Sequence, residues 1–349
     1  MMCFLYTNLP KKGGYTLKKL RSSFLFIMVL TLAMIITACG GGNEGGTSGA
    51  GEEGGTDGGK QNLSLLTGGT GGTYYPLGGQ IGNIISDNTD ANITPQTSGA
   101  SAENMETLRN GEAEIAFSQT DIASYAIEGK EMFDGAAIDN IQAIAPLYPE
   151  TIQLVTTADS GIKSVEDLKG KSVSIGAPGS GVYINAMQIL EIHGLTTDDI
   201  KAQNLSFDES TDGIQSGNID AAFVTAGTPT GAVEALSAQA DVVIVPLADD
   251  KIAELVEKYP YYSEDTVPSG TYKIDSEVKT VAVKAMLVAS KDLDENLVYE
   301  MTKAMFENTD QITHAKGELI KAETALEGLG EMELHPGAAK YFEEKGISK

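Results

Sequence analysis

The stretch LLTGGTGGTYYPLGGQIGNII, from Leu65 to Ile85, decides the fold. A short apolar run leads into a loop of glycine and threonine, and the loop opens into a segment with the apolar spacing of a helix. Backbone N–H groups at such a helix start can hold a small anion. The stretch therefore predicts a strand, an anion-binding loop and a helix, although a plain strand-to-helix turn would also use glycines.

Two nucleotide-binding patterns do not fit this loop. Counted from Gly69, the dinucleotide fingerprint needs a glycine where Tyr74 stands. Neither this loop nor the later glycine loop at 179–181 contains the Gly-Lys-Ser/Thr run of a P-loop. The hydroxyls of Thr70 and Thr73 and the neighbouring tyrosine ring suit a small organic anion, a carboxylate as readily as a phosphate.

The pattern occurs twice in the chain. The segment LRNGEAEIAFS at 108–118 has a counterpart, IQSGNIDAAFV, at 214–224, and a glycine loop that opens a helix lies upstream of each. Strands that alternate with helices predict two α/β lobes, each with a mostly parallel sheet. Ligands of open sheets lie beyond the carboxyl ends of the strands. Two strand ends and two helix starts should therefore point into one cleft.

The expected elements follow from the same periodicity. We expect strands at 63–66, 93–97, 115–118, 144–148, 152–156, 172–175, 222–225, 242–245 and 280–290. We expect helices that include 81–85, 101–111 and 184–192. The segments 144–148, 152–156 and 280–290 are predicted to lie near a hinge between the lobes.

Polar residues at these loop and strand ends are the predicted ligand contacts. They are Thr70, Gly71, Gly72, Thr73, Tyr74, Ser98, Gln119, Ser180, Gly181, Asn185, Thr225 and Gly227. Only Asp121 among their neighbours is charged, and it could serve as a helix N-cap. No nucleophile–base pair, paired carboxylates or metal-ligand cluster stands among them, so we predict binding without catalytic residues, metal or cofactor.

The composition excludes several classes of partner. The chain has 49 acidic against 24 basic residues and a formal net charge of −25, which argues against nucleic acid and against an anionic membrane surface. The only cysteines are Cys3 and Cys39, so the folded part has no disulfide. The histidines show no metal-ligand spacing and are expected on the surface or in helices: His193, His314 and His335. Arg109, the only arginine after Arg21, is assigned to a helix surface.

The N-terminus indicates export. Basic residues at 11–21 precede an uncharged apolar run at 24–38, which is shorter than the ~20 residues of a membrane span. The sequence Ile-Thr-Ala-Cys that ends at Cys39 resembles the bacterial lipobox, with Cys39 as the lipidation site, although an ordinary signal peptide could carry an accidental cysteine. We assign 1–38 to a lipoprotein signal peptide and the glycine-rich segment 39–62 to a flexible tether.

Several motifs together resemble one family. TGGTGGTYYPLG at 67–78, SVEDLKGK at 164–171, GAPGSG at 176–181, and the segments 129–134 and 217–227 are similar to the TAXI family, the TRAP-transporter-associated extracytoplasmic solute receptors. The resemblance implies an α/β protein of the type II periplasmic-binding-protein fold, with two lobes, a hinge and a central ligand cleft. It places the threonine-glycine loop, Tyr74, Ser98, Gln119, Ser180 and the Thr225 strand end on ligand-facing positions.

The resemblance also implies a function. A receptor of this family would bind glutamate, glutamine or a related dicarboxylate outside the bacterial cell membrane and deliver it to TRAP membrane subunits. Lobe 1 would take 63–160, lobe 2 would take 161–272, and 273–349 would return to lobe 1 with C-terminal helices. The alternatives are a two-lobed transferase-like enzyme, which would need an acid, base or lysine in the cleft, and a sensory lipoprotein of the same fold.

Overall fold

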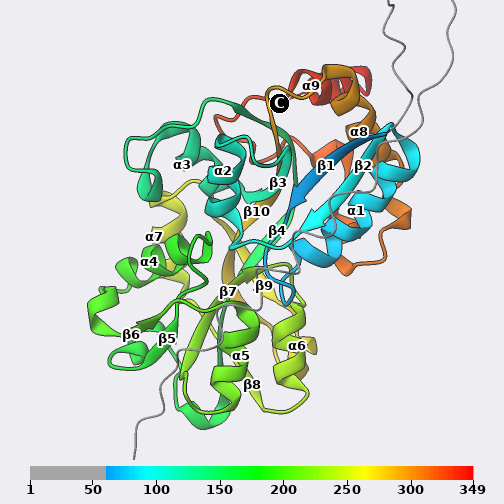
Figure 1. Cartoon of the computed structure of the whole chain (residues 1–349). Helices are drawn as coiled ribbons and strands as arrows, with labels where there is room; N and C mark the ends of the chain where they lie inside the picture. Colours follow the sequence, from blue (N-terminus) through cyan, green and yellow to red (C-terminus); the bar gives the residue numbers. More distant parts are fainter. Residues whose placement is uncertain (1–59, 349) are drawn as a thin grey trace, which may run out of the picture. The chain divides into compact units, whose positions relative to one another are not determined.

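The computed structural model describes residues 60–348 (Figure 1). The predicted signal peptide, the lipidation site Cys39 and nearly all of the predicted tether lie outside the described residues. The first strand, β1 (Gln61–Leu66), begins two residues earlier than expected. The prediction that Gln61 and Asn62 belong to the tether is therefore wrong, because both residues are part of the sheet.

The strands of the described residues form one sheet. They are β1, β2 (Ala91–Gln96), β3 (Ile115–Gln119), β4 (Ile141–Thr157), β5 (Ser172–Ser174), β6 (Lys201–Gln203), β7 (Ala221–Ala226), β8 (Val242–Val245), β9 (Ser263–Val267) and β10 (Val278–Ser290). The order is β2-β1-β3-β10-β4-β7-β5-β6, with β8 on β4 and β9 on β10. Among these, β6 and β9 were not predicted: β6 has only three residues, and the largely polar residues 263–267 of β9 lack apolar alternation.

Nine α-helices accompany the strands within residues 60–348. They are α1 (Tyr74–Asn88), α2 (Ser101–Arg109), α3 (Thr120–Glu128), α4 (Val182–Ile192), α5 (Phe207–Gln215), α6 (Gly231–Ser237), α7 (Asp249–Lys258), α8 (Glu295–Glu307) and α9 (Pro336–Glu344). The repeat is confirmed at the level of elements: α2 and α5 begin at 101 and 207, and β3 and β7 begin at 115 and 221, 106 residues apart in both cases.

The parallel pairing is confirmed only away from the middle of the sheet. In one half β1 pairs in parallel with β2 and β3, and in the other β5 pairs in parallel with β6 and β7. Between them β4 and β10 run antiparallel to each other, and β10 pairs antiparallel with β3 and β4 with β7. The two strands predicted at 144–148 and 152–156 are one continuous strand, because β4 passes through both halves.

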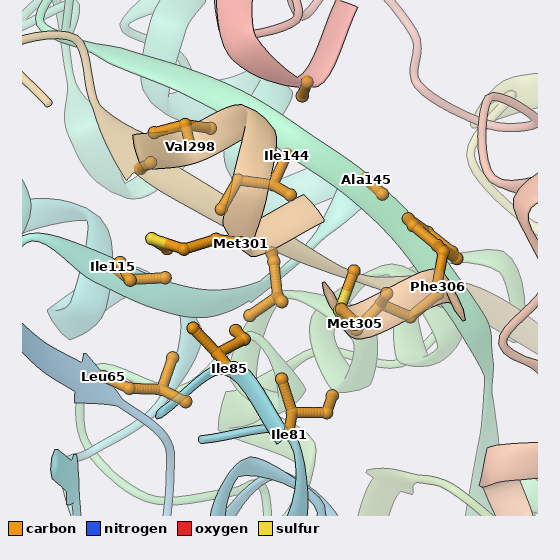
Figure 2. Close-up of a cluster of buried hydrophobic side chains, with 14 of the residues drawn as sticks. Leu65, Ile81, Ile85, Ile115, Ile144, Ala145, Val298, Met301, Met305 and Phe306 are labelled. Atoms are coloured by element: carbon orange, nitrogen blue, oxygen red, sulfur yellow. The ribbon is translucent and has the colours of Figure 1, made fainter. Parts of the chain in front are cut away.

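Each half of the sheet has its own hydrophobic core. Helices α1, α8 and α9 pack on the half that contains β1 to β3 (Figure 1). Figure 2 shows part of this core, in which side chains from strands and from both α1 and α8 face one another: Leu65, Ile81, Ile85, Ile115, Ile144, Met301 and Met305. A separate core surrounds β5 to β8, with apolar residues from α4, α6 and α7. The described part is a two-lobed mixed α/β fold with β4 and β10 shared by both lobes.

Helix α1 explains how the opening stretch folds. Its buried apolar residues recur at three- and four-residue intervals at Leu77, Ile81, Ile84 and Ile85, so one face packs on the sheet. Gly78 on the same face leaves space for Phe117, since a β-carbon there would lie 3.1 Å from that ring. The packing brings the start of α1 to the carboxyl ends of β1 and β3, where the cleft lies.

Candidate functional site

A cavity lies between the two lobes. It contains about 640 Å³ of space outside protein atoms, including its opening to solvent. The four segments identified by the repeat all line it: the starts of α1 and α4, at Tyr74 and Gly181, and the ends of β3 and β7, at Gln119 and Thr225. This convergence confirms the geometric expectation from the two repeated units.

Nine of the twelve predicted ligand contacts line this cavity. They are Gly71, Gly72, Thr73, Tyr74, Ser98, Gln119, Ser180, Gly181 and Thr225. The other three, Thr70, Asn185 and Gly227, do not. Thr70 is exposed, and its hydroxyl donates to the Asp208 carboxylate across the cleft at 3.3 Å. The carbonyl of Gly227 accepts from the Thr73 hydroxyl at 3.2 Å, so this strand end contacts the opposite lobe.

Two helix starts supply hydrogen-bond donors to the cavity. Neither Thr73, before α1, nor Gly181, before α4, caps its helix with a side chain, and neither helix has an acidic residue in its first turn. The first N–H groups of a helix have no partner within the helix and carry its positive end. Both starts can therefore accept a negatively charged group.

Two polar atoms at the cavity are buried and have no hydrogen-bond partner among residues 60–348: Ser180 Oγ and Gln119 Oε1. Buried polar atoms in folded proteins are nearly always paired, and an unpaired one calls for an explanation. Both atoms belong to residues that line the cavity, and a bound solute would supply the missing partners. The Ser98 hydroxyl differs, because it already donates to Asn104 Oδ1 at 2.6 Å and accepts from Ala100 N at 3.0 Å.

The expectation of a cleft that is neutral apart from Asp121 is wrong, because the acids that line the cavity are Asp208 and Glu150, whereas Asp121 does not line it. Asp208 is exposed, and the buried acid is Glu150. Its side chain comes from the middle of β4, only 2% of the residue is exposed, and its Oε2 accepts from the Tyr74 hydroxyl at 2.7 Å. Burial raises the pKa of the Glu150 carboxyl to about 8. Glu150 lies in no glycine loop or strand end. The only signal in the sequence is an acidic residue inside the apolar run of a central strand.

A buried polar network joins the lobes behind the cavity. Asn185 donates to Asp121 Oδ2 at 2.9 Å and to the Tyr262 hydroxyl at 3.0 Å. Its Oδ1 accepts from Gln119 Nε2 at 3.3 Å and from Thr225 Oγ1 at 3.1 Å. Asn185 thus contacts both strand ends and holds them together from behind the residues that line the cavity.

Asp121 is not the helix cap that the sequence suggested. Helix α3 begins at Thr120 with Gln119 in the N-cap position, so Asp121 lies inside the first turn and is fully buried. Burial raises the pKa of the Asp121 carboxyl to about 6. Within residues 60–348 its Oδ1 has no side-chain hydrogen-bond partner, and the Asn185 side chain and the backbone at Ile122 and Asp121 favour its charged form.

The lobes contact each other on both sides of the cavity. The N–H groups of Ala102 and Glu103, at the start of α2, donate to the Gly179 carbonyl at 3.0 Å. On the other side the Ala232 N–H donates to the Gly71 carbonyl at 3.0 Å. These bonds join backbone of one lobe to backbone of the other, so the described structure is a closed arrangement.

The lone arginine lies away from the cavity. Arg109 ends α2, pairs with Glu106 at 2.5 Å and is more than a third exposed, so its assignment to a helix surface is confirmed. Each histidine adjoins a helix: His193 follows α4, His314 precedes the 3-10 helix Ala315–Leu319, and His335 precedes α9. His335 is buried, however, and so is not a surface residue. Residues 60–348 contain no group of three or more His, Cys, Asp or Glu side chains that could hold a metal ion.

In the part of the chain that the structure describes, no helix has the length and apolar character needed to cross a membrane.

Comparison with known proteins places the chain among two-lobed binding folds. The model of the NMT1-like family matches residues 65–346. A structure from Bordetella bronchiseptica RB50 aligns with a TM-score of 0.51 and 18% identity, over 82% of this chain and 82% of that one. The likeness supports the predicted two-lobed, periplasmic-binding-protein type of fold.

Two further solved structures match less closely in shape. The alkanesulfonate-binding protein SsuA from Xanthomonas axonopodis pv. citri, bound to MOPS, aligns with a TM-score of 0.48 and 14% identity, over 83% of this chain and 81% of that chain. PhnD1 from Prochlorococcus marinus, in complex with methylphosphonate, aligns with a TM-score of 0.49 and 12% identity, over 82% and 97%. MOPS and methylphosphonate are ligands of those two proteins.

Proposed function

The chain belongs to the NMT1-like family, and from its cleft we propose that it is a solute receptor that closes two lobes on a small organic acid or amino acid. The observation that carries the proposal is the cavity between the lobes. Two uncapped helix starts face it, and two of its lining residues, Ser180 and Gln119, have buried polar atoms without partners in the described part of the chain. Such donors suit a carboxylate.

We propose further that the receptor works outside the cell membrane, tethered through a lipid on Cys39, and delivers its ligand to the membrane subunits of a TRAP transporter. The support is the lipobox-like sequence and the resemblance of the glycine-loop motifs to TAXI receptors. Glutamate, glutamine and related dicarboxylates are the ligands that this resemblance favours.

An enzyme of the same architecture fits the cavity less well. Ser180 is the buried hydroxyl at the helix start, but its Oγ has no partner within the described residues, so no base activates it as a nucleophile. The two buried carboxyls, Glu150 and Asp121, are bonded to Tyr74 and Asn185 respectively. This arrangement favours binding over turnover.

A thermal-shift screen tests the proposed function. Amino acids, dicarboxylates, sulfonates and phosphonates are each added to the purified protein, and a true ligand at about a hundred times its Kd should add ~2.7 kcal/mol to the unfolding free energy. Mass spectrometry after prolonged incubation should recover that ligand unchanged. A catalytic product would favour the enzyme, and a screen without any stabilising compound would reject the receptor.

A further inference from the structure

We infer that Glu150 is the residue that sets the ligand specificity of this cavity, by pairing with a protonated amine, so that amino acids bind in preference to analogues with a hydroxyl or carboxylate in place of the amine. This inference rests on the proposed function, because it concerns the same cavity. It adds an acidic contact that the glycine-loop motifs do not contain.

The position of Glu150 carries the first step. It lies on β4 opposite Val283 of β10, at the crossing of the two lobes, and it lines the same cavity as the starts of α1 and α4. Tyr74 links the two kinds of contact, since it is the first residue of α1 and also donates its hydroxyl to Glu150. Its ring is held by stacking on Phe117, with centroids 4.8 Å apart. An acidic acceptor and the anion-binding helix start are therefore adjacent, as the ammonium and carboxylate of an α-amino acid are.

The charges around Glu150 carry the second step. None of the ion pairs among the described residues includes it. The groups that act on it are the Tyr74 and Tyr148 hydroxyls, the Asp121 carboxyl, the Gln119 side chain and Lys316. They comprise one further carboxyl, two phenols and one amide, and Lys316 forms no ion pair with Glu150.

The cost of burial carries the third step. A buried carboxylate without a charged partner is expensive, so the unliganded group stays protonated, in agreement with its pKa of about 8. A ligand ammonium would supply the missing charge and release the proton. A second ligand carboxylate at the same place would lie beside Glu150, whose charge Asp121 already disfavours from behind the cavity, and a further negative charge so close disfavours binding.

The test uses matched pairs of ligands, each an L-amino acid and the hydroxy acid of the same skeleton: glutamate with 2-hydroxyglutarate, aspartate with malate, leucine with 2-hydroxyisocaproate, and phenylalanine with phenyllactate. Isothermal titration calorimetry measures both members. In the pair that binds best, we expect the amino acid to bind at least ~100-fold more tightly, since a site built around a polar group rejects analogues that leave it unpaired. A hydroxy acid that binds as tightly as its amino acid overturns the inference.

Glu150→Gln, which keeps the size and removes the charge, should bring the two affinities within about tenfold of each other. The matched control is Glu106→Gln, which removes a carboxylate from the surface of α2 and should leave the ratio unchanged. An unchanged ratio in Glu150→Gln overturns the inference.

Proton release on ligand binding can be measured with the wild-type protein, so this test does not depend on the correct folding of a variant. With a pKa of about 8, the Glu150 carboxyl is mostly protonated at pH 7, so the binding of an amino acid should release most of one proton per site. Titrations in phosphate and in Tris, whose ionisation enthalpies differ, measure this number. Binding without release means that Glu150 stays protonated and donates to the ligand, which contradicts the inference.

The outcomes separate the inference from the proposed function. If hydroxy acids bind and amino acids do not, the proposed receptor function stands and the inference about Glu150 fails. If no compound binds, the proposed function itself fails.

Discussion

At the scale of single residues, Gly72 and Arg109 separate two ways of holding an anion. Gly72 lines the cavity at the start of α1, and a β-carbon there would meet the Phe207 ring at 3.4 Å, an ordinary contact. Arg109 is engaged with Glu106 on the surface of α2. If helix N–H groups hold the anion, the glycine matters and the arginine does not.

Gly72→Val should therefore abolish binding that Arg109→Gln leaves nearly unchanged. The valine branches extend past the β-carbon into the cavity and block the N–H groups, and hydrogen bonds to a charged group contribute about 1.5–3 kcal/mol each. Calorimetry on folded variants measures both affinities. The opposite result, loss of binding in Arg109→Gln and normal binding in Gly72→Val, would make the lone arginine the anchor.

The buried carboxyls predict an unusual dependence of stability on pH. The folded-state pKa values of Asp121 and Glu150, about 6 and about 8, lie above their ordinary values, so these two carboxyls hold more protons in the folded protein than in the unfolded chain between about pH 4 and pH 8. Burial lowers the pKa of His314 and His335, which opposes this effect near pH 6, but the two carboxyl shifts are large. The free energy of unfolding should accordingly fall as the pH rises through this range. Thermal melts of the unliganded protein at pH 5 and pH 8 measure the difference, which Asp121→Asn should reduce. A higher Tm at pH 8 than at pH 5 would contradict this account.

At the scale of elements, glycines let the loops of the two lobes approach each other. A β-carbon on Gly181 would lie 1.7 Å from Gln119 Oε1 and 2.8 Å from Ile122 Cγ1, and one on Gly71 would lie 2.3 Å from an Asp208 oxygen. In each pair the glycine and its neighbour belong to different lobes. Gly181 and Gly71 therefore allow the close approach of the two lobes, in addition to the local turn of each loop.

Gly181→Ala should weaken ligand binding at least tenfold while the fold persists, because the added methyl group holds the lobes apart. The control is Gly79→Ala within α1, where a β-carbon meets nothing within 4 Å. That variant should bind normally and gain about 0.5–1 kcal/mol of stability, since alanine favours a helix more than glycine does. Small-angle scattering with and without ligand follows closure. Full ligand-induced compaction in Gly181→Ala would refute the explanation.

At the scale of the whole molecule, the location of the receptor depends on residues outside the described part. The basic and apolar N-terminal segments and the Ile-Thr-Ala-Cys sequence predict export and acylation at Cys39. The glycine-rich segment that follows would separate the lobes from the lipid. A receptor held in this way can meet membrane subunits without a transmembrane helix of its own.

Cys39→Ser should release the protein from the membrane fraction and leave ligand affinity unchanged. The serine cannot carry the thioether-linked lipid, whereas the cavity residues are untouched. Fractionation followed by immunoblotting measures the distribution, and calorimetry measures binding. A processed serine variant that still sediments with membranes would show that Cys39 is not the anchor.

Local sequence determined the repeated elements and most of the cavity wall. The glycine loops, the apolar spacing of α1 and α4 and the turns at strand ends are short-range signals, so they predicted which helix starts and strand ends converge. The shared strands β4 and β10 were predicted as strands near a hinge, with β4 as two separate pieces. Their antiparallel pairing joins residues more than a hundred positions apart, which no local pattern encodes.

Tertiary structure alone decided the polarity of the cavity. Glu150 is unremarkable in the sequence, and only the crossing of β4 with the lobe interface buries it beside Tyr74. From the sequence, Asp121 is predicted to be a helix cap. Its hydrogen bond from Asn185 exists only because α4 of the other lobe packs against it. The role of an ionisable side chain depends on its environment, because burial determines both its pKa and the free-energy cost of leaving its charge unpaired. That environment is built by contacts distant in sequence, and so the acidic side of this cleft could be found only after the chain had been folded.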